Sequence, residues 1–445
     1  MTEPAWVQHA IWWHVYPLGF TGAEPTMLAG QPTVHRLPQL HAWLDYALEL
    51  GASGLALGPV FTSESHGYDT TDYFRIDPRL GDDRDFDELI RQAHARGLKV
   101  LLDGVFNHAG RGFGPFQGVL AEGPAAPTAP WFRLTWPQTG WTPGTVPGYE
   151  DFEGHHHLVA LNHDEPEVAG FVAEVMKHWL GRGADGWRLD AAYAVPPAFW
   201  KAVLADVRRE YPQAYFVGEY IHGDYPREAG AGTLDSVTQY ELWKAIWSSL
   251  NDANFYELAA ALERHNGFLE TFAPLTFVGN HDVTRLASKL TNADQLPLAL
   301  AVLLTVGGTP SIYYGDEQAF RGLKEDRAGG DDAVRPAFPA EPSELAQVGR
   351  PVYHLHQELI GLRRRHPWLH NARTKVVTLS NEHLVYEASS NGAAITVALN
   401  LSGTAAQLLV PSSARTLLAG PGTRPSARNE VNLPGYGWAV LGTVT

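Results

Sequence analysis

The chain has 445 residues, 44% of them hydrophobic, and carries a formal net charge of −16. This length exceeds that of one ordinary domain and suits a large domain with a smaller appendage. The negative charge argues against nucleic acid and anionic membranes as partners. Because the chain has no Cys, disulfides, thiolate metal sites and a Cys nucleophile are excluded.

The N-terminal sequence Met-Thr-Glu-Pro-Ala-Trp has no basic region followed by an apolar core, so we expect no signal peptide. No apolar run in the sequence is long enough to span a membrane. We therefore expect a cytoplasmic protein without a membrane partner.

Strand-like and helix-like segments alternate over most of the chain. Short apolar runs predict strands, and apolar residues at helical spacing predict helices between them. Eight strands alternating with helices over this length predict an α/β fold, a (β/α)8 TIM barrel. In chain order the expected elements are strand 11–16, helix 34–50, strand 55–60, helix 82–95, strand 99–106, helix 166–180, strand 186–190, helix 197–209, and strands 215–219, 236–240, 275–279 and 310–314, with helices up to about residue 365.

Two regions depart from this alternation. Residues 107–160 hold many Gly, Pro, aromatic and His residues with little periodicity, and a loop this long inside a compact domain is usually functional. After residue 367, short β-type runs separated by turn residues predict a small antiparallel domain, with strands at 375–379, 383–388, 394–399 and 406–409. The expected organisation is a barrel in two parts (1–106 and 161–366), an inserted loop domain (107–160) and a C-terminal β domain (367–445).

Chemically active side chains stand where the expected strands end. The catalytic residues of such a barrel lie at the C-terminal ends of its strands. We therefore expect these side chains to meet at one open end of the barrel, which we call its mouth. A structural role would explain any one of them, but their joint position at strand ends favours a functional site. They are His66 and Tyr68 after the second strand, Asn107 and His108 after the third, Asp190 and Glu219 at the ends of the fourth and fifth, and Asn280, His281 and Asp282 after the seventh.

Arg188 precedes Asp190 by two positions and therefore lies on the same face of the extended strand. A guanidinium beside a carboxylate favours the ionised form of that carboxylate. An ionised Asp at a strand end could act as a nucleophile or as a local charge, or it could belong to a structural ion pair.

Four segments, Asp103–His108, Gly186–Tyr193, Gly218–Tyr220 and Phe277–Asp282, resemble the four signature regions of the α-amylase family of glycoside hydrolases, in the family's order. Gly67-Tyr68-Asp69, Leu161-Asn162 and residues 308–317 also match. The matches cover the expected barrel from its second to its eighth strand. The resemblance implies an enzyme that hydrolyses O-glycosyl bonds with retention of configuration, which requires two carboxyl groups close together.

The resemblance also implies a role for each residue. Asp190 would be the nucleophile, Glu219 the general acid and then base, and Asp282 the support for the distorted sugar and its developing charge. The implied substrate-binding residues are Tyr68, which would stack beneath the sugar ring, His108 and His281, which would hydrogen-bond its hydroxyls, Arg188, which would keep Asp190 ionised, Arg285, which would touch substrate or form a salt bridge, and Tyr220, which would face the leaving group or pack into the barrel rim.

We expect no required metal and no other cofactor. Calcium-dependent relatives have Lys-His where this chain has Tyr193 and Ala194, although Asn107, which would supply another calcium ligand, is present and can equally cap or bridge the loop. The first strand–helix loop lacks the acidic run that binds calcium in some relatives. Three adjacent His cannot all face one ion, so we interpret residues 155–157 as polar loop residues rather than a metal cluster.

Residues 234–244 resemble the sixth-strand region of cyclomaltodextrinases, neopullulanases and maltogenic amylases. So does Leu161-Asn162 followed by Pro166-Glu167-Val168, although Val159-Ala160 departs from the usual Pro-Lys. Those enzymes carry an N-terminal domain that builds a dimer over the site. This chain starts almost directly at its first strand, so we expect that domain to be missing. We therefore expect the loop 107–160, or another mode of association such as a homodimer, to control substrate size.

The expected function is hydrolysis of short linear or cyclic α-1,4/α-1,6 gluco-oligosaccharides, releasing maltose or glucose. A cyclic maltosyl-maltose hydrolase would fit the size and the missing domain. Two alternatives are a transglycosylase on the same scaffold and a non-catalytic binding subunit. Inactive relatives usually lack one or more of the three catalytic acids or have gained a membrane segment. This sequence has all three acids and no such segment.

Overall fold

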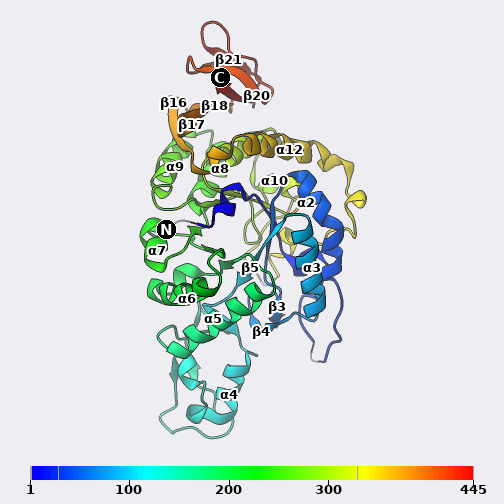
Figure 1. Ribbon diagram of the computed structural model, residues 1–445, viewed down its shortest axis with the longest axis vertical. Coiled ribbons are helices and arrows are strands. Elements are labelled where there is room, and N and C mark those ends of the chain that lie inside the picture. The colour runs from blue at the N-terminus through cyan, green and yellow to red at the C-terminus, as the bar shows by residue number, and fades with distance from the viewer. Residues whose placement is uncertain (1–2, 29, 328, 444–445) are drawn as a thin grey trace.

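The computed structural model describes residues 3–28, 30–327 and 329–443. Residues 1–2 and 444–445, at the ends of the expected N-terminal and C-terminal domains, lie outside the described residues. Figure 1 shows three parts along the long axis: the barrel in the middle, the segment around α4 (Gly114–Glu122) at one end, and the C-terminal sheet at the other.

Eight parallel strands form the barrel and confirm the predicted fold. Their order is β13-β12-β11-β5-β2-β1-β15-β14. Among the described residues, a parallel bridge between Thr238 and Leu275 closes the barrel, and the Gln239 N–H donates to the Leu275 carbonyl at 2.9 Å. The strands are β1 (Trp12–Val15), β2 (Gly54–Leu57), β5 (Lys99–Gly104), β11 (Gly186–Leu189), β12 (Tyr215–Gly218), β13 (Ser236–Val237), β14 (Leu275–Thr276) and β15 (Thr309–Tyr313).

Helices cover the outside of the barrel. The longest are α3 (Asp83–Ala95), α5 (Pro166–Gly181), α6 (Pro197–Glu210), α8 (Tyr240–Asn251), α9 (Phe255–Phe268), α11 (Leu296–Thr305) and α12 (Arg350–Arg365), and the shorter ones are α1 (Pro17–Phe20), α2 (Leu44–Leu50), α7 (Tyr225–Gly232) and α10 (Leu286–Lys289). The expected start of α3 is correct because Asp82 forms a capping box with Asp85.

The first expected helix is shorter than predicted. Instead of one helix over 34–50, a 3-10 helix runs over Leu37–Trp43 and α2 follows it. Pro38 lies in the first turn, where its missing N–H breaks no helical hydrogen bond. A helix that began at residue 34 would need that N–H and would clash with the ring, so residues 34–36 stay outside the helix. Gly51 ends α2 with a φ of 100°, a left-handed conformation that Gly adopts without strain.

The inserted segment is more ordered than the expected loop. β6 (His108–Gly110), β10 (His155–Ala160) and β9 (Asp151–Phe152) form an antiparallel sheet, and β7 (Leu134–Thr135) pairs with β8 (Gly148–Tyr149). Between β2 and α3, the pair β3 (Phe61–Ser63) and β4 (Thr70–Ile76) holds the turn that carries His66 and Tyr68.

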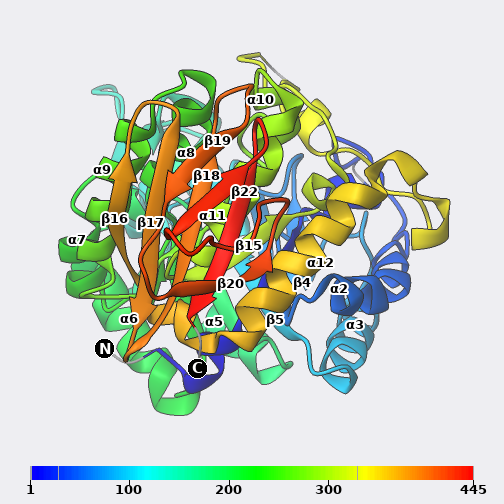
Figure 2. The same cartoon turned by 90° about the horizontal axis from the view of Figure 1, so that it is seen from above.

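The C-terminal domain is antiparallel, as predicted, but has more strands than the four expected. β16 (Arg373–Leu379), β17 (His383–Ser390) and β18 (Ala393–Asn400) form one sheet with β22 (Trp438–Thr443) and β20 (Ala414–Ala419), and β19 (Ala406–Leu409) pairs with β21 (Glu430–Leu433). Figure 2 shows this sheet over α8 and α11, with α12 beside it.

Side-chain alternation divides the C-terminal sheet between two cores. Leu384, Tyr386 and Trp438 belong to the large core that also contains the barrel helices, whereas Val385 and Leu441 belong to a small core of their own. The Tyr386 hydroxyl hydrogen-bonds Thr305 Oγ1 at 2.6 Å across this junction. Among the helices within the described residues, none is both long and apolar enough to cross a membrane.

Candidate active site

The candidate site lies at the C-terminal ends of β5, β11 and β12. The register places Arg188 of β11 beside Asp103 of β5 on one side and Val217 of β12 on the other. Asp190 and Glu219 follow the last residues of β11 and β12. All four polar side chains, Asp103, Arg188, Asp190 and Glu219, are buried, so the barrel strands hold them rigidly.

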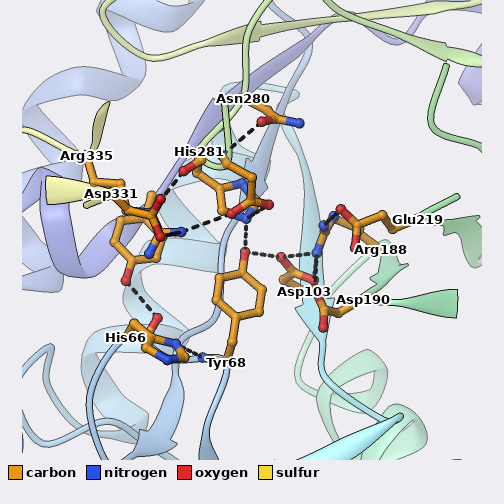
Figure 3. Close-up of polar contacts among 12 residues, drawn as sticks. His66, Tyr68, Asp103, Arg188, Asp190, Glu219, Asn280, His281, Asp331 and Arg335 are labelled. Atoms are coloured by element: carbon orange, nitrogen blue, oxygen red, sulfur yellow. Dashed lines mark hydrogen bonds and ion pairs between the residues drawn. The ribbon is translucent and has the colours of Figure 1, made fainter. Parts of the chain in front are cut away.

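One guanidinium joins three carboxyl groups. Arg188 Nη1 donates to Asp103 Oδ1 at 2.7 Å and to Asp190 Oδ1 at 3.0 Å, and its Nη2 lies 2.7 Å from Glu219 Oε1. In Figure 3, Arg188 lies between Glu219 on one side and Asp103 and Asp190 on the other. Because one planar group contacts both Asp190 and Glu219, these two carboxyls lie close together.

The electrostatics favour one shared proton in this cluster. Burial and the neighbouring Glu219 charge raise the pKa of Asp190 well above its ordinary range, with Arg188 opposing them. Burial also raises the pKa of Asp103. One guanidinium cannot balance three buried carboxylates, so the cluster favours a protonated carboxyl beside an ionised one.

The Glu219 carboxyl is fixed from three sides. Besides Arg188, its Oε2 accepts from the Ala191 N–H at 3.0 Å, and its Oε1 accepts from the Tyr240 hydroxyl at 3.2 Å. Ala191 has a φ of 44°, which is left-handed and strained for a residue with a Cβ. This conformation turns the N–H that follows Asp190 toward Glu219. A cavity of about 30 Å³, room for about one water, lies inside the barrel against Glu219 and Arg188.

Asp282 is held on the opposite side of the mouth. Its Oδ1 accepts from Arg335 Nη2 at 2.9 Å, and its Oδ2 lies 2.9 Å from His281 Nε2. Desolvation opposes ionisation of Asp282, but His281 and Arg335 outweigh it and hold the pKa of this carboxyl well below its ordinary range. Asp331 shares Arg335 with Asp282, at 3.1 Å (Figure 3).

Tyr68 connects the two halves of the site. Its hydroxyl donates to Asp103 Oδ2 at 3.0 Å and contacts His281 Nε2 (Figure 3). The His281 ring is nearly parallel to the rings of Tyr16 and Tyr68, with ring centroids 6.1 and 5.2 Å away. The expected positions of Tyr68 and His281 beside the acids therefore agree with the geometry.

His108 is engaged by protein groups at both ring nitrogens. Burial lowers its pKa to about 3, so the imidazole is neutral. Nε2 donates to the Tyr68 carbonyl at 3.0 Å, and Nδ1 accepts from Asn107 Nδ2 at 3.2 Å. Phe152 stacks on the ring at 4.6 Å between centroids. In this arrangement the amide of Asn107 orients His108, and a sugar hydroxyl would have to displace one of these partners.

The structure places two expected substrate-binding residues in the barrel wall instead. Arg285 has no exposed surface, and its guanidinium donates to Asp316 Oδ1 at 2.9 Å and to the carbonyls of Tyr314 and Val334. Tyr220 is 2% exposed and packs against Tyr225. For both residues the geometry agrees with the structural alternative, a salt bridge for Arg285 and rim packing for Tyr220.

Other residues of the site were not predicted from the sequence. Arg335 and Asp331 come from the long loop after β15, where no periodic pattern marks them. Tyr240 falls within the segment 234–244, whose resemblance to relatives was the available signal. Within the described residues, the close grouping of His and acidic side chains with metal-ligand spacing consists of His35, Asp82 and Asp85. It does not include residues 155–157, which form the exposed start of β10.

The fold and this constellation together define a barrel glycoside hydrolase with clustered carboxyls at the strand ends. Residues 37–376 match the family described as "Alpha amylase, catalytic domain". The chain therefore belongs to the α-amylase family of glycoside hydrolases.

Individual relatives agree with this assignment. The chain is 30% identical to a cyclomaltodextrinase of Geobacillus thermopakistaniensis, over 98% of this chain and 77% of that protein. The debranching enzyme of Nostoc punctiforme superposes with a TM-score of 0.84 at 28% identity, covering 100% of both chains. The cyclic α-maltosyl-(1→6)-maltose hydrolase of Arthrobacter globiformis superposes with a TM-score of 0.83 at 26% identity, again covering 100% of both. The chain is thus a glycoside hydrolase that is similar to cyclomaltodextrinases and maltogenic amylases.

Proposed function

We propose that the protein is a retaining α-glucoside hydrolase that cleaves short linear or cyclic gluco-oligosaccharides with α-1,4 or α-1,6 linkages and releases maltose or glucose. The observation that carries this proposal is the single guanidinium of Arg188 that joins Asp190 to Glu219. A retaining mechanism needs two carboxyls close together, one ionised and one protonated.

In this mechanism, Asp190 attacks the anomeric carbon and forms a covalent glycosyl-enzyme while Glu219 gives its proton to the leaving oxygen. Glu219 then takes a proton from the water that attacks the intermediate, and Asp190 leaves. Arg188 stabilises the ionised form of the pair. Asp282, kept ionised by His281 and Arg335, stabilises the positive charge that develops on the sugar.

The substrate class rests on the similarity to named enzymes. A cyclomaltodextrinase and a cyclic maltosyl-maltose hydrolase both match nearly the whole chain. We therefore propose cyclic as well as short linear substrates. Their sugars are neutral, in keeping with a chain of net charge −16.

The test is a product analysis with maltose, maltotriose, panose, cyclodextrins, cyclic maltosyl-maltose, starch, trehalose and sucrose. We expect maltose or glucose from maltotriose and from at least one cyclic substrate. Turnover of only trehalose or sucrose would contradict the proposal, and dominance of products longer than the substrate would favour transglycosylation.

Substitution tests the roles. Glu219→Gln should lower kcat on the best substrate by several orders of magnitude, because Glu219 serves both chemical steps. Glu210→Gln, at the exposed end of α6, is the matched control and should keep wild-type activity. Unchanged turnover in Glu219→Gln would remove this residue from the mechanism.

A further inference from the structure

Side chains from three different loops meet at the rim of the mouth. Glu153 lies at the tip of the β9–β10 hairpin, Tyr193 in the loop after β11, and His222 in the loop after β12. The Tyr193 hydroxyl donates to Glu153 Oε1 at 2.9 Å, and the rings of Tyr193 and His222 lie 5.3 Å apart. We name this set, Glu153, Tyr193 and His222, the rim bridge. It links the inserted segment directly to the barrel.

The rim bridge stands next to the two carboxyls of the proposed mechanism. Tyr193 follows Asp190 by three residues, and its backbone N–H donates to the Glu219 carbonyl at 3.3 Å. His222 follows Glu219 by three residues. Burial and the adjacent Glu153 carboxylate raise the pKa of Tyr193, so its phenol stays protonated and remains a donor. The backbone of the bridge thus adjoins the segments that carry Asp190 and Glu219.

The hairpin tip is anchored on the same side at a second point. Phe152, next to Glu153, stacks on the buried His108 ring with an interplanar angle of 17°. Glu153 itself has a φ of 53°, a left-handed conformation that is strained for a residue with a Cβ. The turn alone gives no reason for Glu at this position, since Gly or Asn would adopt the conformation with less strain. The contact with Tyr193 does give a reason.

We propose that the rim bridge is a latch that limits the length of the leaving group and so selects short or cyclic oligosaccharides over long linear glucans. This inference rests on the proposed function. A glucan chain that continues past the leaving glucosyl unit must pass the joined hairpin and loop, whereas a short leaving group ends before them. The Glu153 side chain is exposed, so the hydrogen bond biases selection and does not forbid longer chains.

The test compares kcat/KM for maltotriose with kcat/KM for long-chain amylose. Tyr193→Phe removes only the donor hydroxyl, and Glu153→Ala removes the acceptor carboxylate with the rest of the side chain beyond Cβ. Each should raise the amylose-to-maltotriose ratio by about three- to tenfold, the range that one solvent-exposed hydrogen bond supports. The double variant should rise no further than either single one, because both remove the same contact.

Two controls separate the latch from a general loosening of the inserted segment. Glu153→Gln keeps an acceptor oxygen and should keep the wild-type ratio. Tyr149→Phe removes a hydroxyl elsewhere in the same segment, where it donates to the His156 carbonyl at 2.6 Å, and should also leave the ratio unchanged.

The possible results separate failure of the latch from failure of the proposed hydrolase function. If wild type cleaves maltotriose but Tyr193→Phe and Glu153→Ala leave the ratio unchanged, the latch is wrong and the proposed function stands. If wild type cleaves neither maltotriose nor amylose, both fail. A ratio that rises equally in Tyr149→Phe would also overturn the latch. Should Tyr193→Phe fold poorly, Glu153→Ala carries the same test from an exposed position.

Discussion

At the scale of single residues, Asp103 has almost no exposed surface, yet two groups of the site depend on its charge. Its oxygens accept from Arg188 and from the Tyr68 hydroxyl, so it orients both side chains without reaching a substrate. Its negative charge also contributes to the raised pKa of Asp190.

Asp103→Asn should therefore lower kcat, because Arg188 loses a charged partner, and shift the acidic limb of the pH profile of kcat/KM to lower pH. The shift is downward because removal of a neighbouring negative charge makes Asp190 easier to ionise. Measurement of kcat/KM from acid to neutral pH checks this. Asp252→Asn, on the exposed end of α8, should leave the profile unmoved. An upward shift in Asp103→Asn would contradict our account of the cluster.

Much of the site was predictable at this scale because its residues stand at strand ends. Asp190 and Glu219 end two of the predicted strands and His281 lies two residues beyond a third, and parallel strands bring such positions to the same end of the barrel. Arg335 was not predictable in the same way, since it reaches Asp282 from a loop 53 residues further along the chain. The position of Arg285 in the sequence also did not show whether it binds a sugar or pairs with Asp316, because an Arg suits either role.

At the scale of elements, the turn after β15 buries acidic groups that the proposed mechanism does not use. Burial raises the pKa of Glu317 to about 7, although the Tyr46 hydroxyl and the Gly315 N–H donate to it. An unfolded Glu titrates at about 4.3. Because the folded pKa is the higher one, the stability that this group contributes is fully present below about pH 4 and is lost as the pH rises through about 7.

Glu317→Gln removes this titration. Wild type should lose about 2.6 kcal/mol of stability from this group between pH 5 and pH 8.5, so the free energy of unfolding of the variant should rise by that amount relative to wild type. Urea unfolding at the two pH values measures it. Glu341→Gln, which is exposed, should show no pH-dependent difference from wild type. A difference that does not change between the two pH values would mean that Glu317 is already ionised in the folded protein at pH 5.

Helices and strands were predictable where a single sequence pattern, such as a capping residue with an amphipathic period, was strong. Capped, amphipathic α3 matched its expected range to within one residue, whereas β13 and β14 have only two residues each and are shorter than the expected strands 236–240 and 275–279. β20, β21 and β22 were not predicted, because Gly- and Pro-containing turns separate them and their pairing partners lie far away in the chain.

At the scale of the whole molecule, the C-terminal sheet shares a hydrophobic core with the barrel. Trp438 and Val440 of β22 lie in the same core as Leu303 and Leu304 of α11. The C-terminal sheet and α11 are in contact through β18 and β22 (Figure 2). A shared core of this kind couples the unfolding of the two parts, because neither can separate without exposing apolar surface of the other.

We therefore expect one cooperative unfolding transition for the whole chain. Trp438→Ala should destabilise it by about 3–5 kcal/mol, the usual effect of truncating a buried Trp, and shift the single transition without splitting it. Calorimetry combined with residual hydrolytic activity measures this, and heat inactivation should follow the calorimetric transition in both proteins. Leu409→Ala, 61% exposed on β19, is the control and should leave the transition in place. A second transition at which activity survives the first would show that the barrel unfolds independently of the C-terminal sheet.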